Sequence, residues 1–175
     1  MERIDGPVFD ALAGSYLNTI SVYNNPKLNS FPFSTLKLFN SLDYFNGWGN
    51  AFTEVPASAF KGMNDLTVIN LSKNAITSIG SDAFSSFYEL KNIYLNDNQM
   101  TVLNGSAFNF GYERPAYIDL RGNKIGRISG TFKQFPYATT LERNYFTTLN
   151  QEQWEPVFND FIDNSVPSQI YFSGE

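Results

Sequence analysis

The sequence predicts an α/β solenoid, a right-handed coil with a parallel β-sheet on its concave face and short helices and loops on its convex face. Three observations predict this fold. An asparagine recurs every 21 to 25 residues, spaced apolar residues precede it, and an aromatic residue follows ten residues later in most copies. Repeats of this length stack into a coil in which each repeat packs only on its neighbours. The asparagines form a ladder that consists of Asn25, Asn50, Asn74, Asn98, Asn123 and Asn144.

The third and fourth copies give the repeat in its most regular form. Residues 66–74 read LTVINLSKN and residues 90–98 read LKNIYLNDN, with an offset of 24. Both fit L-x-x-L-x-L-x-x-N, the signature of leucine-rich repeats, which have periods of 20 to 29 residues. The alternation of apolar and outward residues predicts a short strand in each copy. The crossover that joins such parallel strands is right-handed in nearly all proteins.

The second copy is irregular and admits two registers. We prefer the register that places Leu42, Phe45 and Gly47 before Asn50, because it reproduces the downstream pattern. It puts glycine where the repeat has leucine, so a neighbouring side chain is expected to fill the space.

For the whole chain, we expect a single domain over residues 1–175 with about six to seven repeats, lacking one or both end caps.

The convex side has an aromatic column of its own, which we interpret as stacked core. Alanines precede three of its members (Ala59, Ala83 and Ala107), which predicts a short helical turn in each repeat. The spacing of apolar residues over 157–162 predicts an amphipathic helix, and Ile170 and Phe172 predict a seventh strand. The column consists of Phe60, Phe84, Phe108, Phe132 and Trp154.

Composition excludes several classes of function. The net charge of −5 argues against a nucleic-acid partner, which would need a basic surface. No apolar run is long enough for membrane insertion. The chain has no cysteine and no histidine, which removes the usual nucleophile, general base and metal ligands. We therefore predict no catalytic residue, no metal and no cofactor. A carboxylate pair of Asp119 and Glu142 is the remote enzymatic alternative, but Arg121 and Arg143 nearby favour charge pairing.

The ladder asparagines are predicted to be structural. An asparagine side chain has two N–H donors and an acceptor oxygen. In a turn it can satisfy buried backbone groups, which must be paired.

The concave face is the predicted binding surface. Its outward columns contain aromatic residues and an arginine, the types that are enriched in interface hot spots. The alternative is that tyrosine is simply a good strand residue. The predicted partner-binding residues are Tyr23, Tyr44, Trp48, Tyr94, Tyr117 and Arg121.

Two N-glycosylation sequons are present, Asn70-Leu71-Ser72 and Asn104-Gly105-Ser106. Asn104 is expected in a loop, where a glycan is compatible with the fold. Asn70 is expected on the concave strand, where a glycan would cover the surface.

The segments 28–32 (LNSFP), 54–60 (EVPASAF) and 80–84 (GSDAF) resemble secreted arthropod leucine-rich repeat proteins. The resemblance implies an extracellular, non-enzymatic protein that binds or stabilises a partner protein, with a hetero-oligomer as one form of that association. It also implies cysteine-containing end caps, which this sequence lacks. A cytoplasmic leucine-rich repeat scaffold is the alternative that a cysteine-free chain leaves open.

Overall fold

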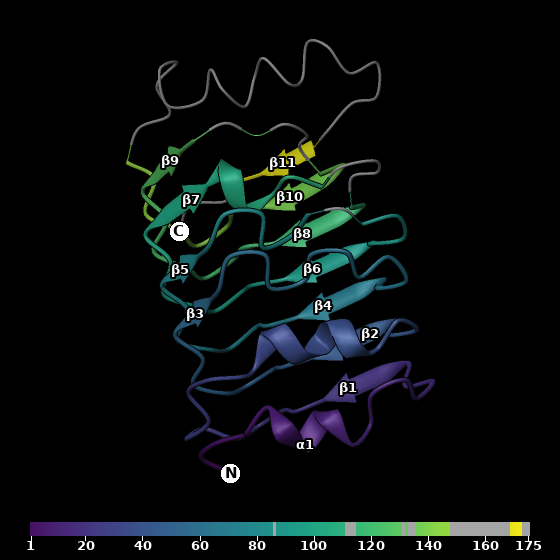
Figure 1. Cartoon of the computed structure of the whole chain (residues 1–175). Helices are drawn as coiled ribbons and strands as arrows, with labels where there is room; N and C mark the ends of the chain where they lie inside the picture. Colours follow the sequence, from purple (N-terminus) through teal and green to yellow (C-terminus); the bar gives the residue numbers. More distant parts are fainter. Residues whose placement is uncertain (86, 111–114, 131, 133–135, 148–168, 173–175) are drawn as a thin grey trace.

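The computed structural model describes residues 1–85, 87–110, 115–130, 132, 136–147 and 169–172. These residues form a solenoid whose concave side is a seven-stranded parallel sheet (Figure 1). The predicted fold class is confirmed. In spatial order the strands are β1 (Thr19–Ser21), β2 (Tyr44–Asn46), β4 (Val68–Asn70), β6 (Asn92–Tyr94), β8 (Tyr117–Asp119), β10 (Ala138–Thr140) and β11 (Gln169–Tyr171).

Strand pairing confirms the preferred register of the second copy. Phe45 pairs with Ile20 on one side and with Ile69 on the other. Gly47 therefore stands at an inward position, and a Cβ there would lie 3.0 to 3.2 Å from Phe52, Leu71 and Phe45. These large side chains fill the space that a leucine occupies in the third to sixth copies.

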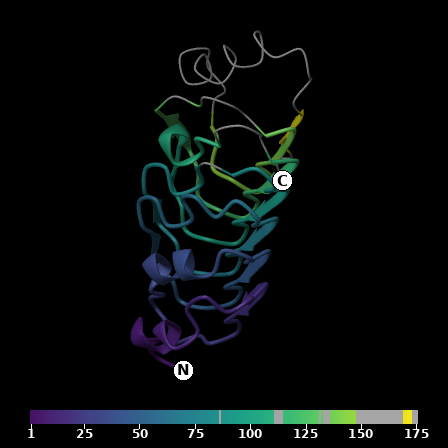
Figure 2. The same ribbon diagram turned by 45° about the vertical axis from the view of Figure 1, so that its right-hand side comes forward.

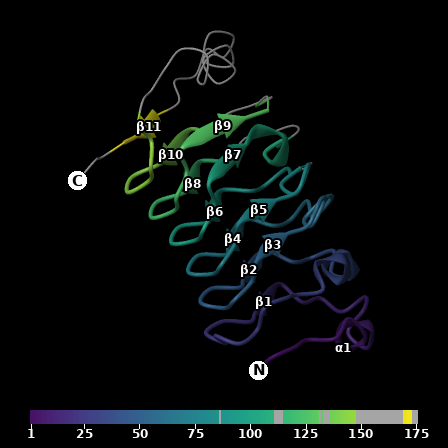
Figure 3. The same cartoon turned by 90° about the vertical axis from the view of Figure 1, so that its left-hand side faces the viewer.

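The opposite side of the coil has short parallel strands, which the sequence did not predict. β3 (Glu54–Val55) pairs with β5 (Ser78–Ile79), and β7 (Val102–Asn104) pairs with β9 (Arg127–Ser129). Figure 1 shows these strands on the left of the solenoid and the long sheet on the right, and Figure 3 views the molecule from the side of the short strands. The core therefore lies between the long sheet and two short two-stranded sheets.

Helices are few and short among the described residues. They are α1 (Pro7–Asp10) and the 3-10 helices η1 (Phe33–Leu38) and η2 (Gly105–Ala107). They lie on the convex side (Figure 2). Of the three predicted helical turns, only Ala107 lies in a helix. Ala59 and Ala83 lie in single hydrogen-bonded turns, because the chain beyond each turn bonds to the next coil instead, as in Phe60 N–H to the Ala83 carbonyl (3.1 Å).

The predicted phenylalanine column is stacked core. Phe60, Phe84, Phe108 and Phe132 are buried, and successive ring centroids lie 5.7, 5.5 and 6.1 Å apart with interplanar angles of 10°, 22° and 20°. Trp154 and the predicted helix over 157–162 lie outside the described residues. The predicted seventh strand is confirmed as β11.

Candidate binding face

The asparagine ladder joins each coil to the coil before it. Asn98 donates from Nδ2 to the carbonyls of Leu71 and Leu95, both at 3.0 Å, and its Oδ1 accepts from Ile76 N–H at 3.0 Å. Leu71 and Ile76 belong to the preceding repeat. Four other asparagines bond to the preceding repeat in the same two ways, namely Asn50, Asn74, Asn123 and Asn144. Asn25 differs, since its Nδ2 bonds to Tyr23 O in its own coil.

The outward columns of the concave face are mostly uncharged. Three positions of each coil face outward: the first and the third residue of the strand, and the second residue after the strand. In most coils these positions hold tyrosine, asparagine, threonine or serine. Among the described members of these columns the charged residues are Asp119, Arg121 and Glu142. The face therefore presents aromatic rings and hydrogen-bonding groups, and few charged side chains.

Three predicted binding residues lie on the first two coils and form the first aromatic group: Tyr23, Tyr44 and Trp48. Tyr23 is exposed, and Tyr44 and Trp48 are half-buried. The Nζ of Lys73 lies 5.3 Å from the centroid of the Trp48 ring, a cation–π distance. The backbone N–H of Trp48 donates to Asn46 Oδ1 at 3.1 Å, which fixes the backbone at this position.

The other three predicted residues lie together on the β6 and β8 coils. The rings of Tyr94 and Tyr117 are in edge contact, with centroids 6.1 Å apart and an interplanar angle of 64°. Thr140 Oγ1 donates to Tyr117 Oη at 3.1 Å. Burial raises the pKa of the Tyr117 phenol above its ordinary value.

Asp119 fixes Arg121 beside these rings. Arg121 Nε lies 3.0 Å from Asp119 Oδ1, and Nη2 lies 2.7 Å from Oδ2. Asp119 is only 2% exposed, although it faces outward from the strand. Its hydrogen bond and charge raise the pKa of Arg121, so the guanidinium is always cationic. We call Tyr94, Tyr117, Asp119, Arg121 and Thr140 the concave cluster.

The six predicted residues thus form two groups rather than one continuous band. The β4 coil separates them, because its outward residues are Val68, Asn70 and Ser72. Parallel strands lie about 4.8 Å apart, so one intervening strand leaves roughly 10 Å between the two groups. A ligand that contacts both groups must span the β4 coil.

Sequence reasoning missed the turn that begins at the third strand position. At the third strand position Asn46, Asn70 and Asp119 each accept the backbone N–H of the residue two positions later. Asparagine and aspartate favour such turns. Their recurrence at one repeat position was the signal that could have revealed this turn.

The two sequons have the same local geometry. In each, the asparagine Oδ1 accepts from both the backbone N–H and the hydroxyl of the serine, Ser72 or Ser106. Asn70 ends β4 on the concave face, as predicted. The loop prediction for Asn104 is wrong: it ends β7 and caps η2, because the Ser106 N–H bond begins the helix there.

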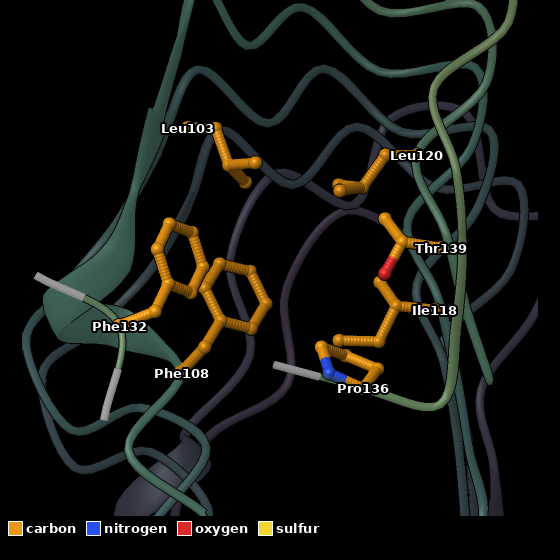
Figure 4. Close-up of a pocket in the computed structure, with 7 residues that line it drawn as sticks. All are labelled: Leu103, Phe108, Ile118, Leu120, Phe132, Pro136 and Thr139. Atoms are coloured by element: carbon orange, nitrogen blue, oxygen red, sulfur yellow. The ribbon is translucent and has the colours of Figure 1, made fainter. Parts of the chain in front are cut away.

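An apolar cavity lies inside the coil, away from the concave surface (Figure 4). It measures about 10 Å³, room for about one water-sized sphere. Leu103, Phe108, Ile118, Phe132 and Thr139 are among its lining residues. The Thr139 hydroxyl is buried without a hydrogen-bond partner among the described residues.

In the described part of the chain no group of acidic side chains is placed to hold a metal ion. None of the described helices has the length and hydropathy of a membrane span.

Comparison with known proteins agrees with this architecture. Residues 40–100 match a family described as leucine rich repeat. A crystal structure of a TLR13–ssRNA13 complex superposes with a TM-score of 0.67 at 16% identity, covering 87% of this chain and 21% of that chain. The chain has a leucine-rich repeat fold. A Drosophila Toll–Spatzle complex matches with a TM-score of 0.44 at 15% identity, over 80% of this chain and 26% of that chain. No curated protein matches the sequence. The chain thus spans about a fifth of the TLR13 chain.

Proposed function

We propose that this leucine-rich repeat protein is a secreted, non-enzymatic binding module that recognises a partner protein through its concave face. The observation that carries the proposal is the concave cluster. Tyr94, Tyr117 and Arg121 are the residue types that contribute most at protein interfaces. Here contacts within the protein already fix their geometry, which lowers the entropy that is lost on binding.

Arg121 remains able to bind a partner although it is paired. A guanidinium has five N–H donors, and the hydrogen bonds to Asp119 come from Nε and Nη2. The remaining donors face away from Asp119, and the Arg121 side chain is 41% exposed. A carbonyl of a partner chain would complete its hydrogen bonding.

A protein partner fits this face better than a nucleic acid. Single-stranded nucleic acids need a positively charged groove beside the stacking aromatics. In the described outward columns Arg121 is the sole cation, and the adjacent Asp119 and Glu142 exceed it in charge. The RNA named in the TLR13 complex is therefore not the ligand class that we propose.

The resemblance to secreted arthropod leucine-rich repeat proteins supports an extracellular location. That group includes the non-catalytic subunit of the deep-sea shrimp luciferase. By analogy, the protein would stabilise or carry a partner in a hetero-oligomer.

Site-specific photo-crosslinking tests the proposal. A photoreactive residue at Asn92, on β6 beside the concave cluster, is compared with one at Lys61 on the convex side. We expect a discrete protein adduct in the source tissue from position 92 and none from position 61. Equal crosslinking from both positions, or adducts only from position 61, would contradict concave recognition. An adduct with RNA would contradict the choice of partner.

A further inference from the structure

Two outward asparagines occupy the surface between the first aromatic group and the concave cluster. Asn46 ends β2 and Asn70 ends β4, and the two residues pair in the parallel register of these strands. Both are half-buried. Neighbouring parallel strands lie about 4.8 Å apart, so the two side chains stand next to each other. The β6 strand follows on the far side of β4 (Figure 1).

The amide oxygens of both asparagines are occupied, whereas their amide hydrogens are free. Asn46 Oδ1 accepts the backbone N–H of Trp48 at 3.1 Å. Asn70 Oδ1 accepts the backbone N–H of Ser72 at 3.1 Å and the Ser72 hydroxyl at 2.6 Å. Neither Nδ2 has a hydrogen-bond partner among the described residues. Because an asparagine amide has two N–H donors, this part of the face complements a ligand that supplies carbonyl oxygens.

The spacing of the aromatic rings restricts the conformation of that ligand. Only β4 lies between β2 and β6, so these two strands are about 9.6 Å apart. A polyproline II helix has three residues per turn and rises about 3.1 Å per residue, so every third residue returns to one side after about 9.3 Å. A β-strand returns a side chain to one face about every 6.6 Å. An α-helix uses its carbonyls in its own hydrogen bonds. The polyproline II helix therefore fits both the ring spacing and the free amides.

Proline is the residue type that suits this surface best. It has no backbone N–H, so a run of prolines presents carbonyl acceptors and needs no acceptor from the protein. Aromatic-lined grooves bind proline-rich segments in this conformation. The rings needed for such packing are held in place, because Lys73 Nζ lies 5.3 Å from the Trp48 centroid and Tyr94 is in edge contact with Tyr117.

The charge of the surface agrees with such a ligand. The outward positions of the β2, β4 and β6 coils hold no charged residue. They are Tyr44, Asn46, Trp48, Val68, Asn70, Ser72, Asn92, Tyr94 and Asn96. A run of prolines is also uncharged, so neither surface loses the hydration of a charge on binding.

We propose that the concave face binds a proline-rich segment of the partner protein as a polyproline II helix that crosses β2, β4 and β6. Prolines three residues apart pack on the first aromatic group and on the ring pair of Tyr94 and Tyr117. Carbonyls of the segment accept hydrogen bonds from Asn46 Nδ2 and Asn70 Nδ2. The proposal rests on concave recognition as proposed above and adds the class of ligand.

A labelled oligoproline of about ten residues is the probe. The whole protein, produced in bacteria so that neither sequon carries a glycan, is titrated into the peptide, and fluorescence anisotropy is recorded. We expect saturable binding with a Kd below about 1 mM. A peptide of equal length with alternating alanine and serine is expected not to bind, because it lacks the preformed polyproline II helix.

Aspartate variants test the amide donors without removing the turns. Asn70→Asp keeps an oxygen that accepts from Ser72 and removes both donors, and Asp119 shows that aspartate fits this strand position. We expect roughly tenfold or greater weakening by Asn46→Asp/Asn70→Asp, since two donors are lost. Asn104→Asp is the matched control. It makes the same change in the same turn on the opposite side of the solenoid, and we expect unchanged binding.

Side-chain amide NMR of the wild type gives a second readout that needs no variant. We expect oligoproline to shift the Nδ2 resonances of Asn46 and Asn70 and to leave that of Asn104 in place. Shifts confined to other amides would overturn the proposal. Three results of the titrations would also overturn it: no saturable binding up to about 1 mM, equal binding by the double aspartate variant, or equal binding of the peptide without proline.

The photo-crosslink at Asn92 distinguishes failure of this proposal from failure of concave recognition. A protein adduct from position 92 without oligoproline binding would reject the proline-rich ligand and leave concave recognition standing. Absence of the adduct would reject concave recognition, and with it this proposal.

Discussion

Arg143 and Asp97 form an ion pair that spans two coils, with Gly122 between them. Arg143 Nη2 lies 3.2 Å from Asp97 Oδ1. All three residues directly precede a ladder asparagine and have left-handed φ values of 53° to 63°. A Cβ on Gly122 would collide with Asp97 Oδ1 and would lie 3.3 Å from Arg143 Nη2. Glycine at this position therefore provides both the turn and the space for the pair.

Gly122→Ala is expected to destabilise the protein by about 2–3 kcal/mol, because strain at positive φ adds to the collision. Gly62→Ala is the control. Gly62 has φ of 79°, and a Cβ added there would have no atom within 4 Å, so strain alone predicts about 1–2 kcal/mol. Urea denaturation of both variants measures the difference. Equal losses would show that the Asp97 contact has no energetic consequence.

Asn98→Ala is expected to cost about 2–3 kcal/mol, because it leaves the Ile76 N–H unpaired in the interior. The Leu71 carbonyl keeps its bond from Asn74 Nδ2 at 3.1 Å. Asn98 is 1% exposed. Asn25→Ala is the matched comparison, because the side-chain bond of Asn25 stays within its own coil, and we expect a loss of less than about 1 kcal/mol there. Thermal unfolding followed by circular dichroism measures both. Similar losses at the two positions would contradict the view that the ladder acts between coils.

Much of the fold could be predicted because the repeat constrains it in several independent ways. The spacing of Phe45 and Asn50 was enough to fix the register of β2 despite Gly47. The outer strands β3, β5, β7 and β9 could not be predicted, since Val55 or Ile79 alone has no period that distinguishes strand from turn. For the site, the sequence indicated which side chains face outward. It did not indicate that Asp119 would be covered by Arg121, because that depends on side-chain conformation.

Thr139→Ile is expected to stabilise the protein by about 1–2 kcal/mol. Strand pairing aligns Thr139 with Ile118 and Ile170, so isoleucine suits this position. The change removes an unpartnered hydroxyl and fills the cavity of Figure 4. Thr139→Val removes the hydroxyl at nearly constant volume and is expected to give part of the gain. A lower unfolding midpoint for both variants would contradict the account of this cavity.

The sequon at Asn104 is expected to carry a glycan when the protein is expressed through a eukaryotic secretory pathway. Asn104 ends β7, which lies on the side of the solenoid opposite the long sheet. A glycan there leaves the concave face free, whereas a glycan on Asn70 would cover that face. Intact-mass measurement before and after enzymatic deglycosylation, with Asn104→Gln and Asn70→Gln variants, assigns the site. An unmodified secreted protein, or a glycan on Asn70 alone, would contradict this prediction.

The most direct test of concave recognition is the affinity of the crosslinked partner for the double variant Tyr94→Ala/Tyr117→Ala. Titration calorimetry compares it with the wild type and with Tyr16→Ala, a tyrosine that is 93% exposed outside the sheet. We predict a loss of at least about tenfold for the double variant, since hot-spot truncations cost about 2 kcal/mol or more, and no change for Tyr16→Ala. Unchanged affinity of a folded double variant would contradict the central claim.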